Sequence, residues 1–303
     1  MKTNNTTHNN DLISNEDSHK EITNLIKLLD DSDEFIYNHV KGKLLERGKD
    51  AIADLLLATS DETPVLNHRV NDLIEEIYFS ETDEKFKELS LRKDNILEEA
   101  VFLMANLGYP ELDMAKYKNE LDEMAEKLNR SIEKMKTNPI IPQNDPLQVI
   151  NIINNFLFFQ QGFKGNSDNF YEAENTYFND VMDRKKGIPI SLSILYLLLS
   201  RRLNLPTYGV NLPAHFIIKY IDNNDEFFID PYNQGIVISK SEAIKFLKRI
   251  GVSKEDFENI SFLQIAADKE IVRRSLNNLL NVYTKSNDKQ KTEQLKKIIA
   301  YFE

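Results

Sequence analysis

The chain has 303 residues, and its 38 lysines and arginines against 49 aspartates and glutamates give a formal net charge of -11. It contains no cysteine, which excludes a disulfide scaffold, a zinc ribbon, a Cys-x-x-Cys redox pair and a cysteine nucleophile. The acidic balance also argues against a nucleic-acid partner, because lysine and arginine supply the affinity for phosphates.

Residues 1–20 contain no aromatic residue and only Leu12 and Ile13 as large aliphatic residues. This small apolar content cannot offset the entropy lost on ordering, so we predict a disordered tail. The polar first residues are unlike a secretion signal, and the longest apolar run, residues 190–199, is far shorter than a membrane span. We therefore expect a cytoplasmic protein with no membrane partner.

Residues 21–90 place apolar side chains at helical spacing. The pattern predicts short antiparallel helices, one of them ending at Gly48, because glycine commonly caps the C-terminus of a helix. Two stretches, Leu28–Asp33 and Arg47–Ile52, resemble HEAT-type repeats. We therefore predict a HEAT-like helical segment over residues 21–90.

A second helical block is predicted from Leu91 to Met135, with a break at the Gly-Tyr-Pro run of residues 108–110. After this block the composition changes, because residues 139–235 hold seven of the nine prolines and five of the nine glycines. Both residue types mark turns and special backbone conformations. We expect any functional site to lie in this stretch.

One predicted helix, from Ile188 to Leu203, is apolar nearly all round, which indicates that it is buried. Pro189 suits its first turn, where a missing N–H costs nothing. Two strands are predicted after it, Tyr208–Ile221 and Glu226–Asp230, separated by a turn at residues 222–225. The chain returns to helix beyond residue 240, and its last part resembles a helical pair of tetratricopeptide (TPR) type. The fold class is therefore α+β and predominantly helical.

The length of the turn between the two predicted strands decides whether His215 and Asp230 meet. If residues 222–223 form the turn, His215 lies directly opposite Asp230; if residues 223–224 form it, the two are diagonal neighbours on one face. A three-residue loop would separate them. A histidine that shares one nitrogen with a carboxylate is half of a nucleophile-activating triad. The alternative is an ordinary half-buried strand histidine beside an aspartate that starts a turn.

A nucleophile for this pair would be expected at a helix N-terminus, where free N–H groups stabilise developing negative charge. The start of the buried helix offers only Ser191 and Ser193. Alternatively, both hydroxyl groups bond to backbone within the buried helix. We predict no metal site and no cofactor, because His215 is the only histidine of the core segment and metal sites usually take three or four ligands.

Several sequence segments between about residues 90 and 285 resemble motifs of a single protein family. They are Gly162–Asn166, Asn175–Tyr177, Asp183–Tyr196, Arg201–Pro206, Gly209–Phe216 and Ile229–Gly235. Together they resemble the SirB1 family, a bacterial branch of the transglutaminase-like superfamily. The resemblance implies a transglutaminase-like, papain-like core with a small antiparallel sheet packed on the buried helix. We assign this core, with its helical lead-in, to residues 91–240 and the TPR-like helices to residues 241–303.

Active enzymes of that superfamily use a Cys-His-Asp triad, and the resemblance implies that His215 and Asp230 occupy the His and Asp positions. The cysteine position falls on Pro189, which has no nucleophilic group. Ser191 lies about 200° further around the helix, and Ser193 returns to the same face about 5–6 Å deeper along the axis. A simple exchange of cysteine for serine is therefore excluded.

Asn175 and Asn211 lie within the matched motifs. We identify them as candidates for lining a ligand-binding cleft. The alternative role for both is to cap a turn or a strand.

Two functions are compatible with these observations. The first is a non-catalytic or regulatory protein that binds a protein or peptide partner through the core cleft and the helical flanks. The second is a hydrolase or acyl transferase in which His215, oriented by Asp230, activates Ser193 or a water molecule. We favour the first, because the nucleophile position carries a proline.

Overall fold

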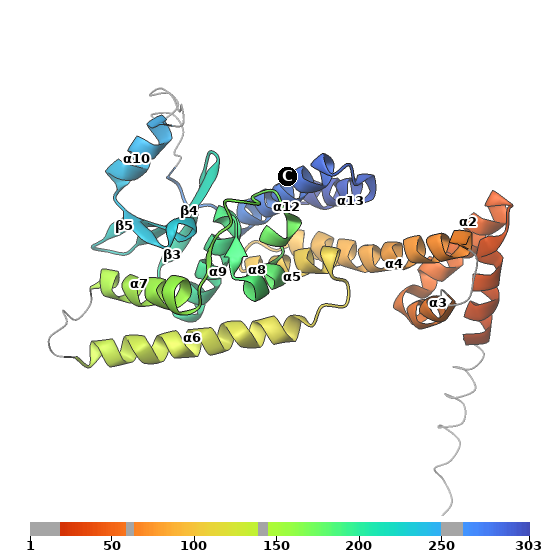
Figure 1. Cartoon of the computed structure of the whole chain (residues 1–303), viewed down its shortest axis with the longest axis horizontal. Helices are drawn as coiled ribbons and strands as arrows, with labels where there is room; N and C mark the ends of the chain where they lie inside the picture. Colours follow the sequence, from red (N-terminus) through yellow and green to blue (C-terminus); the bar gives the residue numbers. More distant parts are fainter. Residues whose placement is uncertain (1–18, 59–63, 139–144, 250–262) are drawn as a thin grey trace, which may run out of the picture. The chain divides into compact units, whose positions relative to one another are not determined.

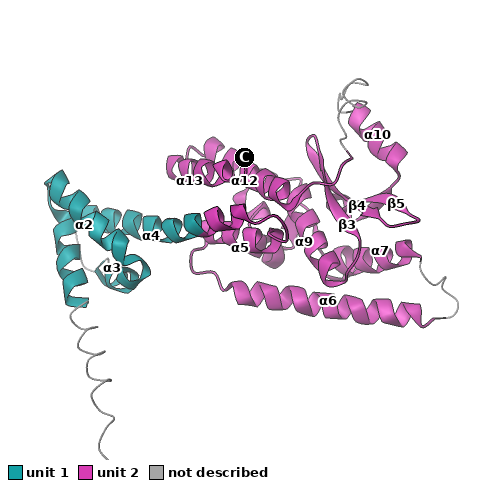
Figure 2. Ribbon diagram, turned by 180° about the vertical axis from the view of Figure 1, so that it is seen from behind, with its two compact units in different colours: residues 1–84 teal, residues 85–303 magenta. Residues whose placement is uncertain are grey.

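The computed structural model describes residues 19–58, 64–138, 145–249 and 263–303. The tail predicted over residues 1–20 therefore lies almost entirely outside the described residues. The chain divides into two compact units, Met1–Glu84 and Lys85–Glu303 (Figure 2). The finer domain limits within the second unit stay predictions.

The first unit is helical, as the apolar spacing predicted. Its elements are helical residues 19–27, η1 (Leu28–Asp30), α2 (Glu34–Arg47), η2 (Gly48–Ala51), α3 (Ile52–Ala58) and the larger part of α4 (Pro64–Leu91). Gly48 caps α2 at a φ of 59°, in the left-handed region that glycine adopts without strain. The apolar faces of these helices enclose one core, in which Leu29, Leu44 and Leu55 are fully buried.

The second unit contains the remaining elements. Its helices are α5 (Leu97–Gly108), α6 (Met114–Lys136), α7 (Pro146–Asn154), η3 (Asn155–Gln160), η4 (Ala173–Asn175), α8 (Phe178–Arg184), α9 (Pro189–Arg202), η5 (Pro231–Asn233), α10 (Lys240–Arg249), α12 (Asp268–Lys285) and α13 (Lys289–Ala300). The predicted break at residues 108–110 separates α5 from α6. Among the described residues, no helix combines the length and the hydropathy that crossing a membrane requires.

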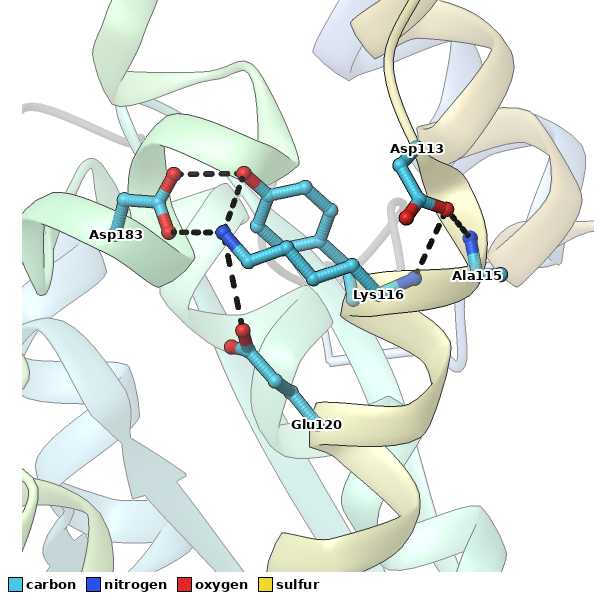
Figure 3. A network of polar contacts seen from close by, with 6 residues as sticks. Asp113, Ala115, Lys116, Glu120 and Asp183 are labelled. Carbon is cyan, nitrogen blue, oxygen red and sulfur yellow. Dashed lines mark hydrogen bonds and ion pairs between the residues drawn. The ribbon is translucent and has the colours of Figure 1, made fainter.

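The N-terminus of α6 is attached to the end of α8. Asp113 caps α6 by accepting hydrogen bonds from the backbone N–H groups of Ala115, at 3.0 Å, and Lys116, at 3.3 Å (Figure 3). Asp183 of α8 accepts a bond from the Tyr117 hydroxyl at 2.6 Å and one from the Lys116 ammonium at 3.4 Å. These contacts fix α8, which is followed by β2 (Lys186–Gly187) and then by the N-terminus of α9.

Helix α9 is buried, as its nearly uniform apolar sequence predicted. Every residue from Pro189 to Ser200 is buried. The helix contacts α6, α8 and the strands β3 and β4 (Figure 1). Pro189 occupies its first turn, where a missing N–H leaves no intrahelical bond unmade. The N-terminus of α9 is therefore held rigidly inside the second unit.

A small antiparallel sheet lies beside α9. It consists of β3 (Thr207–Leu212), β4 (His215–Ile221), β5 (Glu226–Asp230) and β6 (Ile236–Ile238) in this order. A two-residue parallel pair, β1 (Lys164–Gly165) with β2 (Lys186–Gly187), precedes α9. On one face of the sheet, Ile217 and Phe228 pack against Ala243 and Leu247 of α10. Because strand side chains alternate, His215 and Asp230 lie on this same face.

The prediction of one strand from Tyr208 to Ile221 was wrong. The structure has a hairpin there, in which Leu212 pairs with His215. Pro213 has no N–H to give to a ladder, and Ala214 adopts a φ of 57°, which a tight two-residue turn requires. Alanine rarely occupies such a turn position, and strand-forming residues lie on both sides of it. The sequence pattern therefore predicted one continuous strand.

Candidate functional site

The β4–β5 hairpin brings His215 and Asp230 together. Ile221 pairs with Glu226, so residues 223–224 occupy the centre of the turn. This is the second of the two registers predicted from the sequence. In this register, His215 and Asp230 are diagonal neighbours on one face of the sheet. The Nε2 atom of His215 lies 2.8 Å from the Oδ2 atom of Asp230, which is a hydrogen-bonding distance.

Asp230 is buried and also organises the turn that follows β5. Its carboxylate accepts bonds from the side-chain amide of Asn233, at 2.7 Å, and from the Asn233 backbone N–H, at 3.3 Å. Burial alone raises the pKa of Asp230, but the hydrogen bond from His215 and those from Asn233 outweigh it and leave the pKa below its ordinary value. Asp230 is therefore ionised at neutral pH, and its charge orients the His215 ring.

The second ring nitrogen of His215, Nδ1, makes no hydrogen bond within the described part of the chain. In a neutral ring, the proton on Nε2 points to the carboxylate, so Nδ1 is a hydrogen-bond acceptor. The aromatic rings of Phe246 and Tyr232 flank the imidazole, with centroid distances of 5.6 Å and 6.2 Å. The arrangement leaves one basic nitrogen in a mainly apolar environment.

A cavity of about 500 Å³ lies over the pair. His215, Asp230 and Pro189 contribute to its lining together with side chains from the sheet and from α10. The apolar part of the lining includes Leu212, Ile217, Ile236, Ile238, Ala243 and Phe246. A concave, mostly apolar surface with a few converging polar groups is typical of a ligand-binding site.

The position that faces the pair from α9 is a proline. Pro189 lines the cavity that His215 and Asp230 share. Its assignment to the nucleophile position rests on the family resemblance and stays a prediction. Over the described residues, the cavity lining includes neither serine nor threonine. The helix N-terminus therefore presents no hydroxyl group to His215 in this cavity.

The two predicted serines bond to backbone groups instead. The Ser191 hydroxyl donates to the carbonyl oxygen of Asn175 at 2.6 Å and accepts from the N–H of Ile188 at 3.0 Å. The Ser193 hydroxyl donates to the carbonyl oxygen of Phe216 at 3.4 Å. Both serines are buried, and neither lines the cavity. Their hydrogen bonds correspond to the structural alternative considered for them.

The two asparagine candidates also lie away from the cavity. Asn175 is fully buried, donates to the carbonyl oxygen of Asn169 at 2.6 Å and accepts from the side chain of Asn166 at 2.9 Å. Asn211 is exposed on β3 and accepts a bond from the guanidinium group of Arg274. Asn175 thus fixes the loop before α8, and Asn211 joins β3 to α12.

Sequence reasoning missed the contribution of α10 to the site. Phe246, Glu242 and Arg249 of this helix line the cavity. The available signal was the amphipathic spacing of Ala243, Phe246 and Leu247. It predicts a helix with one buried face, but it does not say which part of the molecule that face covers.

Comparison with known proteins places the cavity within a recognised family region. The family model described as "Transglutaminase-like superfamily" matches residues 115–277. A UPF0162 protein of Xylella fastidiosa is 29% identical over 187 residues, which cover 61% of this chain and 64% of that protein. A UPF0162 protein of Vibrio cholerae is 32% identical over 83 residues, 27% of this chain and 31% of that protein.

A eukaryotic protein shares a shorter region. F-box only protein 21 of Mus musculus is 38% identical over 104 residues, which cover 32% of this chain and 17% of that protein. The chain therefore spans less than two thirds of the length of these curated relatives. No solved structure matches the chain.

Proposed function

The chain belongs to the transglutaminase-like superfamily, and on this premise we propose that it is a non-catalytic member that binds a peptide segment of a partner protein over His215 and Asp230. The observation that carries the proposal is a retained His–Asp pair beneath an apolar cavity whose nucleophile position is Pro189. The motif resemblance supports placing it in the SirB1 branch.

The chemistry of acyl transfer argues against a covalent intermediate on this chain. A histidine in such a site takes a proton from the attacking O–H or S–H group, and Pro189 has neither. The hydroxyl protons of Ser191 and Ser193 are directed to backbone carbonyl groups. A hydrolase or acyl transferase that uses either serine would have to break these bonds inside a buried helix, so we do not favour a serine nucleophile. Hydrolysis by a water molecule that His215 activates is the remaining form of the alternative, and the ammonia-release measurement below tests it.

The cavity has features that suit a peptide. Its apolar walls can bury a large aliphatic or aromatic side chain, which contributes about 1.5–3 kcal/mol when fully buried. The free Nδ1 of His215 can accept a hydrogen bond from a peptide N–H group. A preformed acceptor next to an apolar pocket fixes both the position and the orientation of a bound segment.

The helical flanks extend the proposal. We infer that the helices of the first unit and the antiparallel pair of α12 and α13 act as HEAT-like and TPR-like docking surfaces for the same partner. The contact between α12 and α13 and the acidic, cysteine-free composition are consistent with a protein-binding role.

A selection experiment tests the binding function. A phage-displayed random peptide library is selected on the wild-type protein, and individual peptides are measured against the Ile236→Asp variant. Ile236 is 57% exposed and lines the cavity, so this change leaves the core intact. The Leu147→Asp variant is the control, because Leu147 is 41% exposed and lies outside the cavity lining.

We expect peptides with an apolar residue, an affinity loss of about tenfold or more in Ile236→Asp, and no loss in Leu147→Asp. Ammonia release from glutamine-containing peptides should equal that of the His215→Ala variant. Ammonia release that depends on His215 would refute the non-catalytic assignment. Peptides that bind Ile236→Asp as tightly as the wild type would refute binding in the cavity.

A further inference from the structure

Helix α10 forms one wall of the cavity and is basic on its outer side. Its apolar residues Ala243 and Leu247 are buried against the sheet. The exposed positions of this ten-residue helix carry four cations and a single carboxylate, that of Glu242. The cations are Lys240, Lys245, Lys248 and Arg249. This local balance is opposite to the net charge of -11 of the whole chain.

Within the described residues, these four cations have no carboxylate in direct contact, although Lys240 and Lys245 lie close enough to Glu226 and Glu242 to lower the pKa of those carboxyl groups. In the part of the chain that the structure describes, none of them lies within 4.0 Å of a carboxylate. The two carboxylates nearby already have partners. Glu242 accepts from the N–H of Ser239 at 2.7 Å, and Glu226 pairs with the ammonium group of Lys219 at 2.7 Å. Over the residues that the structure describes, the outer side of α10 therefore carries an excess of positive charge without direct ion pairs.

This charged surface continues into the cavity. The guanidinium group of Arg249 lies over the ring of Phe246, 5.7 Å from its centroid, and that ring lies 5.6 Å from the His215 ring. Lys245 is four residues before Arg249, so both lie on one side of the helix. An extended peptide advances about 10 Å in three residues. A side chain buried near His215 thus leaves the next few residues within reach of Arg249 and Lys245.

We infer that the bound segment is acidic: it places one apolar side chain in the cavity and carboxylates of the adjoining residues against Lys245, Lys248 and Arg249. The inference rests on the proposed function, because the cavity must take a peptide. A short acidic segment fits better than a nucleic acid, since a long polyanion would extend from α10 over a molecule whose net charge repels it.

Defined peptides test this inference by fluorescence anisotropy. Three ten-residue, fluorescein-labelled peptides in a serine and glycine background are compared. One carries a leucine followed by four glutamates, the second has alanine in place of the leucine, and the third has lysines in place of the glutamates. We expect the first to bind tightest, and its affinity to fall as salt screens the charges.

Charge-reversed variants test the surface itself. In the Lys245→Glu/Lys248→Glu double variant, the affinity for the first peptide should fall about tenfold, because two attractive contacts become repulsive. The Lys87→Glu/Lys289→Glu variant changes the net charge equally at exposed positions of the same unit, and should bind as the wild type does. Unchanged binding in the α10 variant would overturn the acidic-partner inference.

The same data separate this inference from the proposed function. If Ile236→Asp weakens binding while the α10 variant does not, the cavity function stands and the acidic partner is refuted. If the α10 variant weakens binding while the leucine and alanine peptides bind alike, cavity binding is refuted, and the inference falls with it because only a charge contact at α10 remains. Duplex DNA and vesicles of phosphatidylcholine and phosphatidylserine are measured as further probes. If either binds more tightly than the first peptide, and the α10 variant loses this binding too, α10 binds polyanions in general and the acidic-peptide inference is refuted.

Discussion

The side-chain amide of Asn154 donates a hydrogen bond to the backbone carbonyl of Gly235 at 2.6 Å. This bond joins the end of α7 to the turn that follows Asp230. The N–H of Gly235 donates in turn to the backbone carbonyl of Asp230 at 2.8 Å. The turn that carries the Asp230 carboxylate is therefore held by a contact between two residues that are 81 positions apart in the sequence.

The Gly235→Ala substitution should destabilise the protein. Gly235 has a φ of 74°, and a Cβ atom there would lie 2.2 Å from the Oδ1 atom of Asn154. The free energy of unfolding should fall by about 3 kcal/mol, from backbone strain and the clash together. Gly162→Ala separates the two causes, because Gly162 has a φ of 76° and no atom within 4 Å of the added Cβ. Urea denaturation that gives equal losses for both variants would show that the Asn154 contact is unimportant.

The Ser191→Ala substitution should lower stability without affecting peptide binding. The hydroxyl group bridges the carbonyl of Asn175 and the N–H of Ile188 inside the protein, so its removal leaves these buried groups with only their direct, long bond of 3.4 Å and costs about 1 kcal/mol or more. Ser193→Ala should cost less, since its single bond is 3.4 Å long. Urea denaturation and anisotropy titration measure both effects. A loss of peptide binding at unchanged stability would place Ser191 in the site and contradict the structural role.

The pairing of His215 with Asp230 could be predicted from the sequence because the two residues are close along the chain. Fifteen residues separate the two, and the period of a strand together with a two-residue turn places them on one face. The burial of α9 was equally accessible, since nearly every residue from Ile188 to Leu203 is apolar. Local periodicity is sufficient in both cases.

Other features depend on contacts that no local pattern reveals. The hairpin turn at Ala214 uses a positive φ at a residue that rarely adopts one. Asn175 is polar and lies in a matched motif, which suggested a ligand-binding role. In the structure it is buried, and its hydrogen bonds to Asn166 and Asn169 hold the loop before α8 in place. The packing of α10 over the cavity depends on contacts with the sheet, which the amphipathic pattern of the helix cannot specify.

Stability should depend on pH through Asp230. Its pKa is lower in the folded protein than in the unfolded chain, where it is about 3.9. The ionised carboxylate therefore stabilises the fold fully above about pH 5, and this contribution is lost as the pH falls through the folded-state pKa. In urea denaturation, the stability difference between wild type and Asp230→Asn should be about 1–3 kcal/mol at pH 7 and smaller at pH 3. If the stability difference is the same at pH 7 and pH 3, the pKa of Asp230 is not lowered by folding and the prediction is wrong.

The Pro189→Cys substitution tests whether position 189 and His215 have the geometry of a thiol–imidazole pair. The chain contains no cysteine, so the new thiol is the only one that iodoacetamide can alkylate. Pro189 lines the same cavity as His215 and Asp230, and a thiol beside a histidine that is paired with a carboxylate loses its proton readily. We expect alkylation at pH 6.5 to be about ten times faster in Pro189→Cys than in Pro189→Cys/His215→Ala. Equal rates would show that position 189 does not face the imidazole, and would remove the main argument that proline replaces the nucleophile.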